Sequence, residues 1–198
     1  KFAESGGLED LAKAPYNALQ YRDKVARFTY PLAMSGQGVM TGMPVDIGPG
    51  ALFYRKDLLD KAGVGEADLT KSWESYIESG KKLKAATGAW LLASAVDIKD
   101  IYIRSNLKDG EGIYFDKSGK PTIDNARFRK AFELAKSARD AGIDGKIGAW
   151  SNEWSEGFKR DKIASQMMGA WLAGHLNNWL APESKGKWDV AVAPKSGN

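Results

Sequence analysis

Apolar residues along the chain recur with two spacings, one typical of amphipathic helices and one typical of short buried strands. Residues 73–87 show the helical spacing, with Ser72 suited to cap the first turn and Gly88 suited to end the helix. A second helical pattern, with a basic opposite face, begins at Asp124 or Asn125. The pattern therefore predicts two long helices, each with one buried face.

Shorter apolar runs alternate with these helices and with strong turn signals such as Gly48-Pro49-Gly50. Residues 112–115 and 121–123 flank a turn and favour a β-hairpin. This alternation is typical of a layered α/β domain. The expected strands are 39–45, 51–54, 90–92 and 163–168, and the expected shorter helices are 56–62, 98–107, a segment around 154–158, and 171–180.

Composition narrows the classes of function. The chain has 198 residues, 43% of them apolar, which is enough for one well-packed domain, or for one domain and a fragment. The net charge of +4 is spread among mixed acids and bases, which argues against nucleic acid as a partner. Without cysteine there is no disulfide and no thiolate metal site. We find no long apolar run and no signal peptide, and we interpret the chain as a piece of a larger protein.

Five segments, in order, resemble one family. Residues 43–59, Met-Pro-Val-Asp-Ile-Gly-Pro-Gly-Ala-Leu-Phe-Tyr-Arg-Lys-Asp-Leu-Leu, resemble the lobe-crossing segment of the extracytoplasmic solute-binding proteins of ABC transporters. The resemblance is to the sugar-binding, maltose-binding-protein-like branch, family 1. Asp161 stands where this family usually has glycine, and Ser165 where it often has methionine. The other four segments are Phe2–Leu11, Ser72–Tyr76, Phe158–Trp171 and Gly186–Pro194.

The resemblance implies an α/β fold: a periplasmic-binding-protein-like (type II) lobe with helices layered on a mixed sheet, and a remnant of the other lobe. Residues 1–45 would be the end of the first lobe with the outgoing crossing strand, and residues 46–198 the second lobe. The implied function is binding of a sugar or oligosaccharide between the lobes, hinge closure, and delivery to an ABC permease. The resemblance also implies a monomer without cofactors, periplasmic or extracellular, held near the membrane by a lipid anchor or the permease.

Five of the seven tryptophans lie between residues 150 and 188, and an indole can stack on the apolar face of a sugar. Trp171 follows Gly169 directly after an expected strand, where open α/β folds bind ligands and a bare glycine admits a ligand to the backbone. By resemblance Trp171 is the aromatic platform of the cleft. Trp150 is about equally consistent with ligand contact and with packing in the hydrophobic core. Three further indoles are expected to be buried or packed: Trp73, Trp90 and Trp188.

Polar candidates accompany these indoles. Asp46 and Gly48 lie in the crossing segment, although from chemistry alone Asp46 is more simply explained as a turn cap. Asp97 and Asp100 flank a strand-to-helix passage, where an acid is usually a helix cap. The resemblance implies that one of the two faces the cleft. The predicted binding set is therefore Asp46, Gly48, Asp97, Asp100, Trp150, Gly169 and Trp171, with no catalytic and no metal-binding residue.

Two alternatives remain open from the residues alone. One is a binding protein of the same fold for a polyamine, a peptide or a metal chelate. The other is a glycoside hydrolase using Glu153 and Glu156, which is disfavoured because an i, i+3 pair lies side by side rather than flanking a bond. His175, the single histidine, has no motif partner and is interpreted as packing or surface.

Overall fold

The computed structural model describes residues 3, 5–108 and 110–196. The chain divides into two compact units, Lys1–Gly48 and Pro49–Asn198, and each is described by itself. The interpretation of residues 1–45 as the end of a first lobe stays a prediction.

The first unit contains two short 3₁₀ helices, η1 (Ala18–Lys24) and η2 (Tyr30–Ala33). The strand predicted over residues 39–45 is wrong, because this segment forms only an isolated bridge between Met34 and Met40. Gly42 and Pro44 explain the difference, since glycine weakens a strand and proline cannot donate to a ladder.

The second unit is built on a three-stranded sheet in the order β2-β1-β3. Strand β1 (Gly50–Arg55) lies in the centre and pairs antiparallel with β2 (Ser165–Gly169) and β3 (Trp188–Ala191). Two isolated parallel bridges, Trp90 to Ile163 and Leu92 to Asp144, continue the pairing beyond β2. The expected mixed sheet is therefore present, with residues 90–92 as single bridges rather than a strand.

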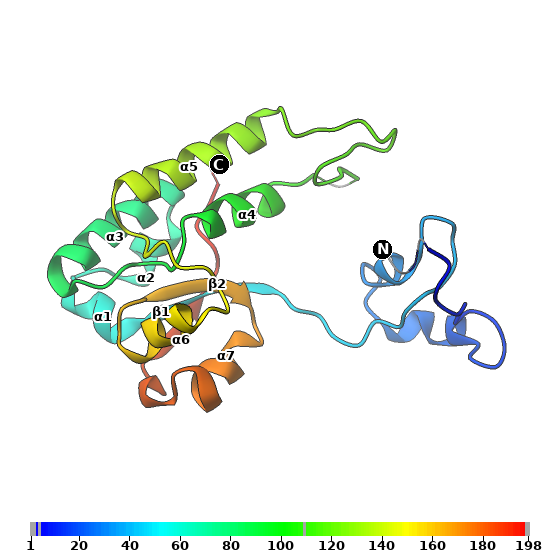
Figure 1. Ribbon diagram of the computed structural model, residues 1–198, viewed down its shortest axis with the longest axis horizontal. Coiled ribbons are helices and arrows are strands. Elements are labelled where there is room, and N and C mark those ends of the chain that lie inside the picture. Colours follow the sequence, from blue (N-terminus) through cyan, green and yellow to red (C-terminus); the bar gives the residue numbers. More distant parts are fainter. Residues whose placement is uncertain (1–2, 4, 109, 197–198) are drawn as a thin grey trace. The chain divides into compact units, whose positions relative to one another are not determined.

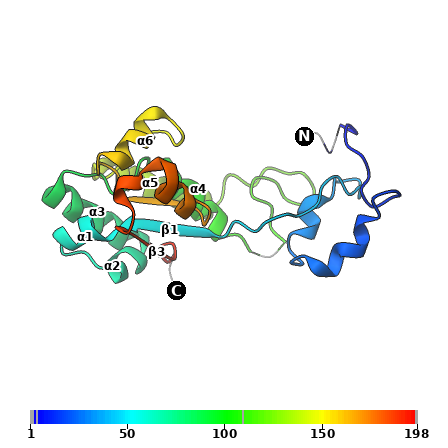
Figure 2. The ribbon, with the colours of Figure 1, turned by 90° about the horizontal axis from the view of Figure 1, so that it is seen from below.

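Helices cover both faces of this sheet (Figure 1). Helices α3, α4 and α5 lie on one face, and α6 and α7 on the other. Helices α1 and α2 pack on α3 at the end of the sheet where β1 finishes (Figure 2). Their bounds are α1 Lys56–Lys61, α2 Glu66–Thr70, α3 Trp73–Thr87, α4 Val96–Ser105, α5 Ala126–Asp140, α6 Asn152–Lys159 and α7 Leu172–His175, followed by a π-helix Leu176–Leu180 (η3) and a 3₁₀ turn Pro182–Ser184 (η4).

Local capping chemistry explains why the two long helices begin where the sequence predicts. The Ser72 hydroxyl accepts a hydrogen bond from the Ser75 amide, and the Asn125 side chain accepts one from the Phe128 amide. Helix α3 ends at Gly88, whose φ of 72° lies in the left-handed region that glycine adopts without strain. Helix α2 was not expected. The predicted hairpin forms as a single antiparallel bridge between Phe115 and Pro121.

Alternation along β1 divides the core into two clusters. Leu52 and Tyr54 pack among α1 to α5, whereas Phe53 packs against α6, α7 and η3. Trp73 is buried as expected. The expectation that Trp90 is buried is wrong: it is half-exposed, and the Lys84 ammonium lies 4.3 Å from its ring centroid.

The two departures from the family pattern each have a local explanation. Asp161 has a φ of 56°, a conformation that glycine adopts without strain, and its carboxylate pairs with the buried guanidinium of Arg55. Ser165 is fully buried, and its hydroxyl donates to the Leu91 carbonyl at 2.6 Å and lies 2.8 Å from the Tyr76 hydroxyl.

Within the described residues, no helix is both long and apolar enough to cross a bilayer.

Candidate functional site

Two exposed tryptophans stack on each other beside the end of β2. The ring centroids of Trp150 and Trp171 are 5.7 Å apart, and the ring planes are inclined by 22°. Trp171 is 43% exposed and Trp150 is 56% exposed. Exposed indoles that stack in this way form an apolar surface suited to the C–H face of a ligand. We call Trp150 and Trp171 the tryptophan pair.

The backbone positions both members of the pair. Trp171 is the N-cap residue of α7, directly after β2. Trp150 has a φ of 68° in the loop before α6, a left-handed conformation that is uncommon for an aromatic residue. Non-glycine residues in such conformations cluster at ligand sites, because the surrounding structure must hold them there.

Gly169 determines how the Trp171 indole lies. A Cβ atom added to Gly169 would be 2.3 Å from Nε1 of Trp171, so the indole lies directly against the bare glycine. The sequence argument assigned this bare face to an approaching ligand. In the structure the indole of Trp171 lies against that face. The absence of a side chain at Gly169 leaves room for the indole.

A buried hydrogen-bond chain lies behind the pair. Trp154 is fully buried, and its ring centroid is 5.0 Å from that of Trp150. Its indole N–H donates to Oε1 of Gln166 at 3.0 Å, and Nε2 of Gln166 donates to Oδ2 of Asp97 at 2.8 Å. Sequence reasoning missed Gln166, because a single polar residue inside an apolar strand pattern does not reveal its partners.

The two candidate aspartates have different surroundings. Asp97 is half-buried on α4 in contact with Gln166. Burial raises the pKa of Asp97, and the Gln166 hydrogen bond acts in the opposite direction. Asp100 pairs instead with Lys99 at 2.7 Å, with 41% of its side chain exposed. Of the two, Asp97 is the one that the structure connects to the tryptophans.

Asp46 and Gly48 belong to the first unit, and both are exposed. The Asp46 carboxylate accepts a hydrogen bond from the Ile47 amide at 2.7 Å, in keeping with the role of a turn cap. That these residues share a cleft with Trp171 stays a prediction.

The aromatic surface continues along the chain after Trp171. His175 lies 5.1 Å from Trp171 and 5.1 Å from Trp179, measured between ring centroids. Its Nδ1 is 3.1 Å from the Trp171 carbonyl oxygen. His175 is therefore a packing partner of the tryptophans, as interpreted from the sequence, and Trp179 is 53% exposed beyond it. The i, i+4, i+8 spacing of these rings was the signal for this extension.

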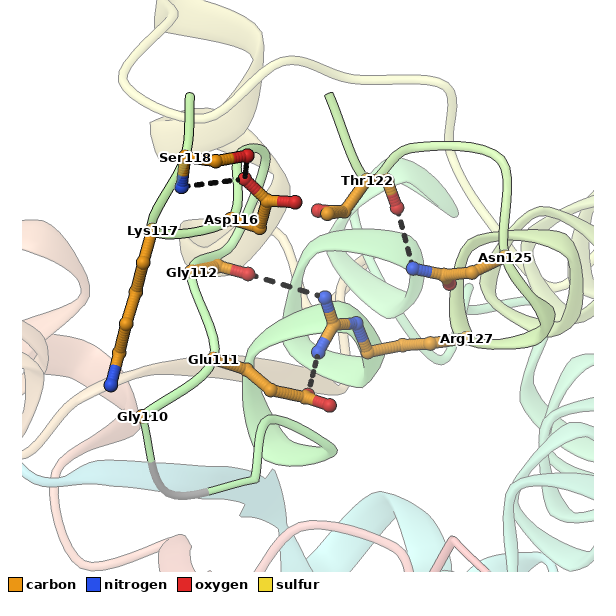
Figure 3. Close-up of a pocket in the computed structure, with 9 residues that line it drawn as sticks. All are labelled: Gly110, Glu111, Gly112, Asp116, Lys117, Ser118, Thr122, Asn125 and Arg127. Atoms are coloured by element: carbon orange, nitrogen blue, oxygen red, sulfur yellow. Dashed lines mark hydrogen bonds and ion pairs between the residues drawn. The ribbon is translucent and has the colours of Figure 1, made fainter. Parts of the chain in front are cut away.

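A separate pocket of about 530 Å³ lies between the hairpin and the start of α5, and the predicted site residues do not line it (Figure 3). Some of its polar groups bond with one another, whereas the Thr122 hydroxyl and Nε of Arg127 are buried with no hydrogen-bond partner among the described residues. Arg127 pairs with Glu111 at 2.8 Å, and the Ser118 amide donates to Asp116 at 2.8 Å. Exposed aromatic rings and the predicted binding residues gather at the tryptophan pair and not at this pocket, so we take the tryptophan pair as the candidate site. In the described part of the chain, no three His, Asp or Glu side chains gather to hold a metal ion.

Comparison with known proteins decides the family. The chain matches the family described as bacterial extracellular solute-binding protein over residues 1–198. The chain belongs to this family of bacterial extracellular solute-binding proteins.

Relatives of this solute-binding protein include two curated proteins. A lactose-binding protein of Rhizobium radiobacter is 31% identical over 165 residues, which cover 82% of this chain and 38% of the relative. An arabinooligosaccharide-binding protein of Bacillus subtilis is 28% identical over 176 residues, covering 87% of this chain and 39% of the relative. The chain therefore spans well under half the length of these curated relatives.

Solved structures show the same fold. The ABC transporter associated binding protein from B. animalis subsp. lactis, in complex with β-1,6-galactobiose, superposes with a TM-score of 0.82 at 28% identity, covering 98% of this chain and 47% of that one. The GacH receptor of Streptomyces glaucescens gives a TM-score of 0.76 at 26% identity, covering 100% of this chain and 50% of that one. The predicted α/β periplasmic-binding-protein-like fold is confirmed.

The family also decides against the hydrolase alternative, because its members are solute-binding proteins rather than enzymes. Glu153 and Glu156 lie on the same short helix, α6, as the sequence predicts. Glu156 bonds to Arg160 at 2.9 Å. This pairing lowers the pKa of Glu156, the opposite of what a general acid at neutral pH requires.

Proposed function

We propose that this protein binds a sugar or oligosaccharide and delivers it to an ABC-type permease, without chemical change. The observation that carries the proposal is the exposed tryptophan pair, linked through Trp154 and Gln166 to the carboxylate of Asp97. Relatives that bind lactose and arabinooligosaccharides support the choice of ligand class.

The chemistry of the site suits a carbohydrate. One face of a sugar ring is lined with C–H groups and stacks on an indole, while its hydroxyls need acceptors held in fixed places. Oδ2 of Asp97 accepts from Gln166. Within the described residues no hydrogen bond to Oδ1 is found, so Oδ1 can accept from a ligand hydroxyl. Stacking by Trp171 or Trp150 and acceptance by Asp97 together make up this half of the proposed site.

The other half would come from the opposing lobe. We assign Asp46 and Gly48 to its crossing segment, and Gly169 to the support of Trp171. In this proposal two lobes close around the sugar by a hinge motion, and the permease recognises the closed form. The protein would act as a monomer, periplasmic or extracellular, held near the membrane by the permease or a lipid anchor.

A titration tests the ligand class. The complete two-lobed protein is titrated with lactose, β-1,6-galactobiose, an arabinooligosaccharide and spermidine, with tryptophan fluorescence as the readout. The exposed indoles should respond to at least one of the sugars at micromolar concentration. A response to spermidine alone would contradict the sugar assignment and favour a cation held by the indoles and Asp97.

A further inference from the structure

We propose that Gln166 is a positioning residue: held by the buried indole of Trp154, it holds the Asp97 carboxylate in the orientation in which it receives a ligand hydroxyl. The contact between Asp97 and ligand rests on the proposed function. The positioning itself rests only on contacts within the chain, and it can therefore be tested separately.

The first step is the orientation of the Gln166 amide. An indole nitrogen can only donate a hydrogen bond. Because Nε1 of Trp154 lies 3.0 Å from the Gln166 side chain, the amide oxygen must face Trp154. The amide nitrogen is therefore turned toward Asp97, where it donates to Oδ2 at 2.8 Å. Trp154 thus determines which end of the amide the carboxylate meets.

The second step is that the amide has no competing arrangement. Gln166 is 2% exposed and Trp154 is fully buried, so water does not compete for these groups. The amide nitrogen also lies 3.3 Å from the Met167 carbonyl oxygen, which gives its second hydrogen a partner. A flipped amide would place nitrogen against the indole N–H and oxygen against the carboxylate, which loses both bonds and adds repulsion.

The third step connects these two hydrogen bonds to the aromatic surface. Trp154 belongs to α6, Gln166 to β2 and Asp97 to α4, so the two bonds join three elements. Trp154 also lies against Trp150, with 5.0 Å between ring centroids. Gln166 therefore links the aromatic surface to the Asp97 carboxylate, which is the proposed acceptor for a ligand hydroxyl. Gln166 itself is buried and does not contact the ligand.

The charges around Asp97 determine how a loss of Gln166 would be seen. Burial raises the pKa of Asp97, the Gln166 bond lowers it, and the neighbouring Asp100 raises it. Asp100 is paired with Lys99, and the Tyr76 hydroxyl on α3 is a further titratable group that interacts with Asp97. Removing the amide should therefore raise the pKa of Asp97 further.

The main test is Gln166→Leu, which replaces the amide with an apolar side chain of similar bulk. The Asp97 pKa is measured by carboxyl carbon NMR in the 198-residue chain, and lactose binding is measured in the complete two-lobed protein. We expect a raised Asp97 pKa and at least tenfold weaker lactose binding. The loss of affinity on acidification should also begin at a higher pH, because the protonated carboxyl is a poorer acceptor.

Trp154→Phe is the companion variant, since it removes the indole N–H and keeps a buried ring. It should raise the pKa of Asp97 less than Gln166→Leu does, because the freed amide can still donate a hydrogen bond to Asp97 part of the time. The double variant should match Gln166→Leu alone. Near-UV circular dichroism verifies that each variant keeps its packing, and either single variant suffices if the other does not fold.

The outcomes separate this proposal from the sugar-binding proposal. An Asp97 pKa that is the same with and without the Gln166 amide overturns the positioning role. A raised pKa together with lactose affinity unchanged in both Gln166→Leu and Asp97→Asn supports the positioning role and contradicts the proposed sugar contact of Asp97 instead.

Discussion

Trp150 and Trp171 come from different segments, the loop before α6 and the cap of α7, yet their indoles stack with centroids 5.7 Å apart. Each ring covers part of the other and leaves its remaining surface to solvent. Replacing either residue therefore changes the exposed apolar surface of both.

Trp171→Ala should weaken sugar binding at least tenfold, or about 1.4 kcal/mol, because the ligand loses a stacking surface and Trp150 loses its partner. Calorimetry with lactose on the complete protein measures the effect. Phe132→Ala is the matched control, since Phe132 is 58% exposed on α5, on the opposite face of the sheet. Equal affinities of the two variants would count against the tryptophan pair as the site.

Gly169→Ala should also weaken binding while leaving the fold intact, because the new methyl group would lie where the Trp171 indole now is, 2.3 Å from Nε1. Gly174→Ala on α7 is the control: its Cβ would lie 4.0 Å from the Asn178 side-chain amide nitrogen, an ordinary contact distance, and alanine favours a helix by up to about 1 kcal/mol. Fluorescence titration with lactose compares the two. If Gly169→Ala binds as tightly as Gly174→Ala, the indole does not need the glycine.

Asp97→Asn should make the folded chain more stable at pH 7 and weaken sugar binding. Burial raises the folded-state pKa of Asp97, so the ionised carboxylate is unfavourable for folding above that pKa. This penalty disappears as the pH falls below the unfolded value near 3.8, where both states are protonated. Urea denaturation at pH 7 and pH 4 should therefore show a stability difference that shrinks on acidification. A wild-type chain more stable than the variant at pH 7 would refute this reasoning.

Asp161→Ala should destabilise the fold more than Asp161→Gly. Both variants remove the ion pair with buried Arg55, but only glycine relieves the left-handed backbone at this position. The difference between the variants should be about 1 kcal/mol, and both should be less stable than the wild type. Arg55 keeps its bond to Asp57 at 2.7 Å, which limits the loss. Identical denaturation midpoints for the two variants would show that the backbone at residue 161 is not strained.

Local chemistry was sufficient for the parts of the fold that depend on neighbours in sequence. Ser72, Asn125 and Gly88 mark the ends of α3 and α5 because a cap needs only the amides or carbonyls of the adjacent turn. The short apolar run over residues 51–54 likewise predicted the buried strand β1. The strand predicted over residues 39–45 was wrong. The β-branched and apolar side chains of this segment suit a strand, but Gly42 and Pro44 prevent a continuous ladder of hydrogen bonds.

The sequence by itself determined where α3 and α5 begin, the layered α/β class and the concentration of indoles near residue 171, since each follows from local spacing or composition. Only the tertiary structure decided that Trp154 is buried and Trp150 exposed, that Trp90 is half-exposed, and that Asp97 rather than Asp100 joins the tryptophans. The link between Asp97 and Trp154 runs through Gln166, whose partners come from two other elements. Burial and hydrogen bonding between distant segments are set by how helices pack on the sheet, and local sequence does not contain that information.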